Sequence, residues 1–195
     1  VDLYSEEHSY DEYDTKRLGT DVNLGLSLGR PYRLDLGYQL EHTEITDSSD
    51  TNAFVDPGGK EFYYNQENIT LSSFRATVSR RVLDNMFLPT RGENGYIRGT
   101  VYGGPLGFDG EFYSLEASYA RYIPLIFKHV LSMRVRGVVL DNYGTDEEIP
   151  LTERLYAGGS RTIRGFKYRS VGPKAFRADG TPDSEQPCGG QSMAL

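Results

Sequence analysis

The sequence predicts an all-β protein, in which about seven antiparallel strands in meander order form a curved, open piece of a transmembrane β-barrel. Three observations predict this fold class. Apolar and polar residues alternate with a period of two, charged residues stand in the middle of the polar faces, and short connections between strands alternate with long ones. No run of 18 apolar residues occurs, which excludes a transmembrane helix but not transmembrane strands, where only every second residue is apolar.

The alternation identifies the strands one by one. In "YRLDLGYQLE", the residues Tyr32, Leu34, Leu36, Tyr38 and Leu40 share one face, while polar residues and a glycine fill the other. The segment "YIRGTVYG" gives a weaker pattern because it is rich in glycine, and "VDLYSE" at the start could be the end of a further strand. Four other segments follow the rule, namely "DVNLGLSL", "SSFRATVS", "FYSLEASYAR" and "VLSMRVRGVV".

Alternating faces fit both a soluble β-sandwich, whose apolar faces form the core, and a membrane barrel, whose apolar face meets lipid. The charges favour the barrel, because full charges of both signs in mid-strand suit a lumen filled with ion pairs. These charges are Arg33, Asp35, Arg75, Glu116, Arg134 and Arg136. The sandwich stays open as an alternative binding module. It would bury Leu34, Leu36, Leu115 and Met133 against a facing sheet.

The connections suggest two regions. "GRPY" and "IPLIFKH" are short, whereas the segments 46–68 and 144–154 are long and acidic, and short turns on one side with long loops on the other are typical of outer-membrane barrels. We therefore expect a partial transmembrane barrel over residues 1–149. Residues 150–195 are expected to form a long extracellular loop and the start of the next strand. Because Val1 is not an initiator methionine, we expect the chain to be a segment of a longer protein.

Composition argues against several classes of function. The net charge of −7 disfavours a nucleic-acid partner. Cys188 is the single cysteine and His8, His42 and His129 are scattered, so we expect no metal site. The paired carboxylates in "DEEI" and "SEEH" stand in polar loops, and we expect no catalytic residue, no cofactor and no enzyme activity.

The segment "YAGGSRTIRGF" at residues 156–166 carries the most specific signal. Together with the strands it resembles the loop signature of the BamA/TamA superfamily, whose core is the tetrapeptide found here as Ile163, Arg164, Gly165 and Phe166. A second feature of that family is an aspartate followed closely by Pro-Thr-x-Gly at a strand entry. Here it is found in "LDNMFLPTRGENGYIRG", as Asp84, Pro89, Thr90 and Gly92.

The resemblance implies that this segment is a long extracellular loop inserted into the barrel lumen. Arg164 would pair with acidic groups of the inner wall, a task that suits a forked guanidinium. Gly165 would permit a tight bend, and the apolar residues on either side of this pair would anchor the tip by packing. Gly158 and Gly159 would let the chain leave its strand and turn inward.

The resemblance also implies a function, which is the insertion of other β-barrels into the bacterial outer membrane. The implied partners are unfolded outer-membrane protein clients, outer-membrane lipid, and accessory assembly lipoproteins that bind N-terminal POTRA domains outside this chain. A related translocator of the TamA or two-partner-secretion kind, and a passive pore without an inserted arginine loop, are the alternatives.

Two features depart from the family pattern. The wall residues that receive the arginine lie mainly on strands after the loop, which would begin near Met193, so Arg164 is not expected to find its partner here. Family loops often hold a cysteine pair, whereas this chain has only Cys188.

Overall fold

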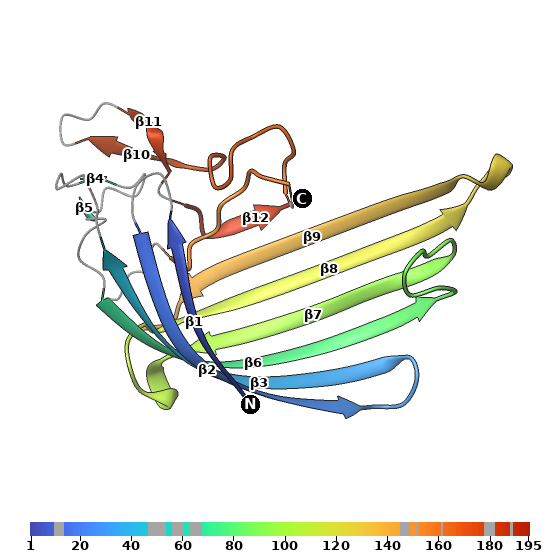
Figure 1. Cartoon of the computed structure of the whole chain (residues 1–195), viewed down its shortest axis with the longest axis horizontal. Coiled ribbons are helices and arrows are strands. Elements are labelled where there is room, and N and C mark those ends of the chain that lie inside the picture. The colour runs from blue at the N-terminus through green and yellow to red at the C-terminus, as the bar shows by residue number, and fades with distance from the viewer. Residues whose placement is uncertain are drawn as a thin grey trace.

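The computed structural model describes residues 1–9, 14–46, 54–55, 61–62, 68–144, 149–150, 152–160, 162–177, 182–187 and 189–195. Eight strands form the main antiparallel sheet, in the order β1-β2-β3-β6-β7-β8-β9-β12. Their bounds are β1 (Asp2–Ser9), β2 (Asp14–Ser27), β3 (Tyr32–Thr46), β6 (Asn68–Leu83), β7 (Gly92–Tyr102), β8 (Phe112–Pro124), β9 (Val130–Asn142) and β12 (Ser192–Ala194). The sheet is curved and open, which confirms the predicted fold class (Figure 1).

A second, four-stranded sheet joins the two long connections. Its order is β11 (Pro182–Pro187), β10 (Lys174–Arg177), β4 (Phe54–Val55) and β5 (Glu61–Phe62). Helical structure in the described residues is confined to the short 3-10 turns η1 (Gly104–Leu106) and η2 (Ile126–Lys128). Among these residues, no helix combines the length and apolarity needed to cross a bilayer.

The long strands arise because the period-two pattern stays in register across the whole sheet. Cross-strand neighbours form rows, and the row of Leu34, Val78, Ile97 and Ala117 is apolar at every member. The next row, with Leu36, Ala76, Gly99 and Leu115, is equally free of polar side chains. These rows form one apolar face that spans five strands of the sheet when β9 is included.

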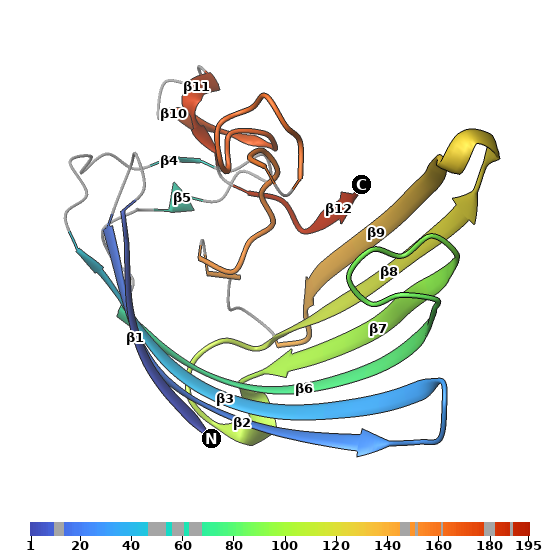
Figure 2. The same ribbon diagram turned by 45° about the vertical axis from the view of Figure 1, so that its right-hand side comes forward.

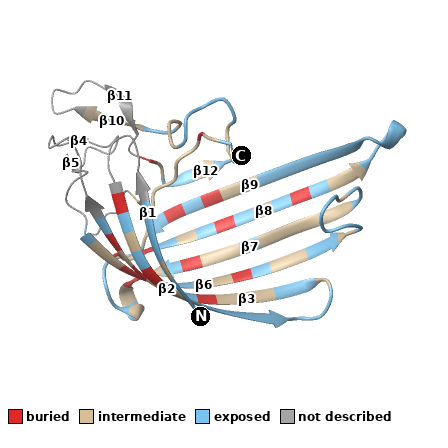
Figure 3. Cartoon of the chain, viewed as in Figure 1, coloured by how far each residue is buried: buried red, intermediate tan, exposed pale blue. Residues whose placement is uncertain are grey.

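Burial separates this apolar face from the polar one. Leu115 and Met133 are exposed on the apolar face, whereas Thr77, Thr100 and Glu116 are buried on the other. Figure 3 shows the buried positions as separate bands along the long strands. Within the described residues, no second sheet covers the apolar face. This is the pattern of a barrel wall with lipid outside, and it removes the sandwich alternative.

The connections lie at opposite ends of the sheet, as predicted. The short turns 28–31, 84–91 and 125–129 gather at one end, and the longer connections start from the other (Figure 1). The segment that follows β9 then folds back inside the curve of the sheet (Figure 2). Its Ile149 completes a small apolar cluster with Leu71, Phe112 and Leu140.

Candidate functional site

The concave face carries the polar side chains of the sheet, and the first cluster surrounds Glu116. The Glu116 carboxylate accepts hydrogen bonds from the Tyr96 hydroxyl at 2.5 Å and from Arg136 Nε at 2.7 Å, and Arg98 Nη1 lies 3.4 Å away. Arg98 stands directly opposite Glu116 in the register of β7 and β8. A buried carboxylate needs such partners to offset its desolvation. The lumen-facing ion pairs predicted from the sequence are therefore present.

The second cluster surrounds Glu41 on β3. Its carboxylate accepts hydrogen bonds from the Tyr4 hydroxyl at 2.5 Å and from Gln39 Nε2 at 3.1 Å, and Arg17 Nη1 lies 3.5 Å away. These side chains come from β1, β2 and β3, so the cluster ties three strands together on their inner face. Arg17 compensates the charge of Glu41 within the cluster, and no described residue of the loop tip takes part in these contacts.

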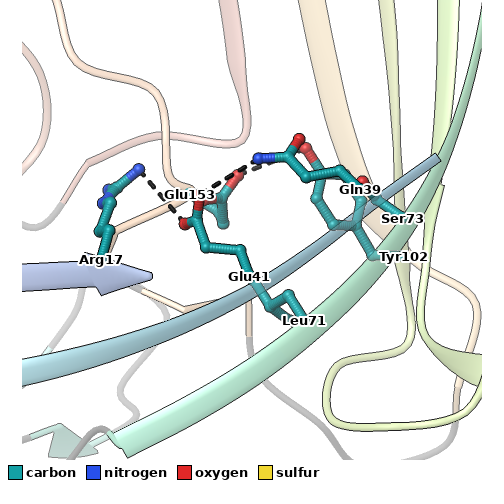
Figure 4. A pocket seen from close by; sticks show the side chains of 7 residues that line it. All are labelled: Arg17, Gln39, Glu41, Leu71, Ser73, Tyr102 and Glu153. Carbon is teal, nitrogen blue, oxygen red and sulfur yellow. Dashed lines mark hydrogen bonds and ion pairs between the residues drawn. The ribbon is translucent and has the colours of Figure 1, made fainter. Parts of the chain in front are cut away.

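A cavity of about 150 Å³ lies between this cluster and the segment after β9 (Figure 4). Glu153 reaches it from the loop, and the Tyr102 hydroxyl donates a hydrogen bond to Glu153 Oε2 at 3.3 Å. Burial raises the pKa of the Glu153 carboxyl, while the positive charge of Arg17 acts in the opposite direction. The cavity is lined by Arg17, Gln39, Glu41, Leu71, Ser73, Tyr102 and Glu153.

The root of the loop is fixed to the wall by apolar packing as well. Ile149 is 2% exposed in its cluster, and Leu155 packs against the same cluster. The Arg154 side chain donates from Nε to the carbonyl of Ile149 at 3.0 Å, which closes the turn between them. Leu155 and Gly190 exchange two backbone hydrogen bonds, so the outgoing and returning chains are joined at this point.

The glycine-arginine segment forms a closed lobe beyond this root. Ala157 and Val171 exchange backbone hydrogen bonds of 2.9 Å at its neck, and the Gly159 amide donates to the carbonyl of Phe166 at 3.0 Å. Gly158 has a φ of 107°, and a Cβ there would overlap the carbonyl oxygen of Lys167. The neck therefore requires glycine, and it holds the tetrapeptide at the far tip of the lobe.

The tip is exposed. The Arg164 side chain is open to solvent and, among the residues that the structure describes, makes no hydrogen bond or ion pair. The wall carboxylates Asp35 and Glu116 are paired with other arginines. Gly165 has a φ of 91°, and the neighbouring Phe166 is largely exposed. The structure thus does not bring Arg164 to a described wall residue, and the lumen role of the tetrapeptide stays a prediction.

The second sequence motif gathers in the turn between β6 and β7. The Asp84 carboxylate accepts hydrogen bonds from the Thr90 hydroxyl and, at 3.0 Å, from the amides of Thr90 and Arg91. These hydrogen bonds, above all the one from the Thr90 side chain, lower the pKa of Asp84 to about 2. Gly92 has a φ of 120°, and a Cβ there would overlap the carbonyl oxygen of Val82. Pro89 lies half-buried in the same turn.

Three residues that hold the loop root were missed by the sequence reasoning: Ile149, Glu153 and Tyr102. The available signal was an apolar residue, Ile149, at the end of an acidic run, but nothing local shows which wall position it packs against. Among the described residues, no group of three His, Cys, Asp or Glu side chains could hold a metal ion. Cys188 lies outside the described residues.

Comparisons with known proteins agree with this geometry. A family model described as the Omp85 superfamily domain matches residues 1–195. The chain is 28% identical over 196 residues to the outer membrane protein assembly factor BamA of Nitratidesulfovibrio vulgaris, covering 100% of this chain and 23% of that protein. It is 25% identical over 177 residues to the protein of the same name from Neisseria meningitidis serogroup B, covering 86% and 22%.

A solved structure gives the same result for the fold. The crystal structure of BamA from Haemophilus ducreyi lacking POTRA domains 1-3 matches with a TM-score of 0.77 at 22% identity, over 98% of this chain and 39% of that one. The chain thus spans less than a quarter of the length of the two curated relatives.

Proposed function

Since the chain belongs to the Omp85 superfamily, we propose that it forms the wall and the inserted loop of a barrel that folds and inserts other outer-membrane proteins. The bacterial outer membrane is its location, as for the relatives it matches. The single observation that carries the proposal is the loop root on the concave face. Ile149 and Glu153 place the segment after β9 inside the curve of the sheet, where a passive pore would keep open space.

The mechanism we propose needs no covalent chemistry and no cofactor. Elsewhere in the barrel a seam between strands opens, the bilayer beside it thins, and the free edge templates the edge strand of a client, because an unpaired strand edge is a ready partner for another strand. The segment described here supplies the stable part of the wall. Its two carboxylate clusters, around Glu41 and Glu116, tie neighbouring strands together while the seam moves.

The proposed role of the lobe is to brace the lumen through Arg164. Its exposed guanidinium, presented by a glycine neck, is free to pair with wall carboxylates outside the described residues. Unfolded outer-membrane proteins are the proposed clients. Accessory lipoproteins are the proposed partners, bound through POTRA domains of the kind that the Haemophilus ducreyi structure lacks in part.

The test uses the full-length protein in cells. Arg164→Ala should lower both the heat-modifiable folded barrel on gels and the surface level of other barrel proteins, and Arg164→Lys should restore them only in part, because lysine lacks the bidentate fork. Arg134→Ala is the matched control, since Arg134 is also an exposed arginine and stands on the polar, concave face of β9. Normal client levels in Arg164→Ala would sink the bracing role and bring the passive pore forward.

A further inference from the structure

The apolar outer face ends in a row of polar and aromatic residues. On the side of the short turns, Tyr32 pairs with Arg80, Arg80 with Gly95, and Gly95 with Tyr119 across four neighbouring strands. The next position outward places Glu93 directly opposite Arg121. Since residues two apart share a face, these side chains continue the same face that is apolar at Leu34, Val78 and Ile97.

The side chains of this cluster are organised around Glu93. One carboxylate oxygen pairs with Arg80 Nη1, and the other accepts a hydrogen bond from the Tyr119 hydroxyl at 2.6 Å. Arg80 also lies over the Tyr32 ring, with its Cζ 6.0 Å from the ring centroid. Each carboxylate oxygen thus has a partner, and Glu93 fixes the direction of Arg80.

The cluster retains donors for a ligand. Arg121 is exposed, and the Glu93 carboxylate across from it attracts its positive charge without coming within ion-pair distance. Arg80 keeps guanidinium donors beyond the one that it gives to Glu93. Arg80, Arg121 and Glu93 together carry a net charge of +1, whereas the whole chain carries −7. The cluster is therefore a positive patch on a negatively charged chain. Two guanidinium groups beside the Tyr32 hydroxyl match the phosphate oxygens of a phosphodiester, whereas the Tyr119 hydroxyl already donates to Glu93.

We propose that Arg80 and Arg121, flanked by Tyr32 and Tyr119, form a binding site for the headgroup of an anionic glycerophospholipid in the leaflet on the short-turn side. Lipid-facing arginines are costly at the bilayer midplane and nearly neutral at its edge, so this row marks the edge of the membrane. The acyl chains then lie along the apolar rows that begin at Val78 and Ile97. Glu93 is a positioning residue in this site.

The inference rests on the proposed barrel only in that the apolar face meets lipid. That premise has its own check: a tryptophan placed at Val78 of the full-length protein should be quenched by brominated phospholipids. The lumen role of Arg164 can fail without affecting either result, because Arg164 lies on the loop and not on the outer wall.

The test is native mass spectrometry of the full-length folded protein titrated with phosphatidylglycerol and, separately, phosphatidylcholine. The unchanged protein should bind phosphatidylglycerol more tightly, and Arg80→Gln with Arg121→Gln should weaken that binding roughly thirtyfold. Arg91→Gln is the matched control, because Arg91 is an exposed arginine at the same end whose described hydrogen bonds use its backbone. The control should bind like the unchanged protein.

Three outcomes overturn the proposal: equal binding of the two lipids by the unchanged protein, unaltered phosphatidylglycerol binding in the double variant, or the same loss in Arg91→Gln. If the double variant does not fold, phosphatidylglycerol binding by the single variant Arg121→Gln tests the site. It leaves the ion pair of Arg80 and Glu93 in place, and it should still weaken phosphatidylglycerol binding by roughly fivefold. Unchanged binding in that variant would also reject the site.

Discussion

Replacing Ile149 with alanine should loosen the loop root without unfolding the wall. Ile149 is 2% exposed and contacts the buried side chains of Leu71, Phe112 and Leu140, which come from three different strands. Truncating a buried isoleucine removes its transfer free energy and leaves a cavity, at a typical cost of about 2–5 kcal/mol. Because its partners on the wall stay packed against each other, the cost should fall on docking of the loop.

Hydrogen exchange of the full-length protein measures this cost locally. The amides of Glu153 and Arg154 donate to the carbonyl of Pro150, and the amide of Leu155 donates to Gly190, so all three report on the root. A loss of about 2–5 kcal/mol corresponds to exchange on the order of 30- to 4,000-fold faster in a peptide that spans them. Ile149→Val should cost only about 0.5–1.5 kcal/mol.

An unchanged exchange rate of the root amides in folded Ile149→Ala would refute the role of Ile149 in docking the loop. Equal acceleration of amides in the middle of β8 would also refute it, because the packing would then support the whole wall rather than the loop. If Ile149 acts only on docking of the loop, exchange of the root amides should accelerate less in Ile149→Val than in Ile149→Ala. Exchange of the β8 amides should stay unchanged in both variants.

Three further predictions concern the loop and the β6–β7 turn. Because burial raises the pKa of Glu153, docking of the root should be strongest at low pH and weaken as pH rises through that raised value. Glu153→Gln should remove this pH dependence from the exchange of the root amides. An unchanged pH dependence in that variant would contradict the role of Glu153. Asp84 has a pKa lowered to about 2, so its contribution is complete above about pH 4 and disappears as pH falls toward 2. Asp84→Asn should therefore speed amide exchange in the turn at pH 6 but not at pH 2. Equal acceleration at the two pH values would refute the stabilising role of the Asp84 charge. Gly92→Ala should destabilise the folded barrel by more than about 1 kcal/mol, since its Cβ meets the Val82 carbonyl at a positive φ. Gly99→Ala, where the Cβ meets open space, should be nearly neutral in the same heat-modifiability assay.

The strands were predictable because one face of each strand meets apolar surroundings and the other face meets polar ones. Along β8, one face is apolar and meets lipid, and it carries Tyr113, Leu115, Ala117 and Tyr119. The other face carries Glu116, which forms ion pairs. The pattern of β7 was weak because Gly99 occupies a position in the apolar row between Ala76 and Leu115, where it adds no apolar side chain to the alternation. A Cβ at Gly99 would meet open space, so packing in the structure does not require glycine there.

The strand ends were less predictable. The sequence pattern of β3 stops near Glu41, whereas the strand continues to Thr46. Beyond the apolar band both faces of a strand meet polar surroundings, so hydrogen bonding continues while alternation does not. The loop root was hidden for a related reason. Ile149 and Tyr102 meet only after the sheet has curved, and no local pattern encodes that meeting.

The loop combines a fixed root with an exposed tip, and this arrangement separates two tasks. Ile149 and Glu153 hold the chain on the wall, with contacts that do not involve the tetrapeptide. Beyond the neck at Gly158, Arg164 is exposed and pairs with none of the described wall carboxylates, and Glu116 among them is paired with Arg98 and Arg136. If Arg164 pairs with a wall carboxylate outside the described residues, as we propose, that pairing need not unpack the root, because the described contacts that hold the root do not involve Arg164.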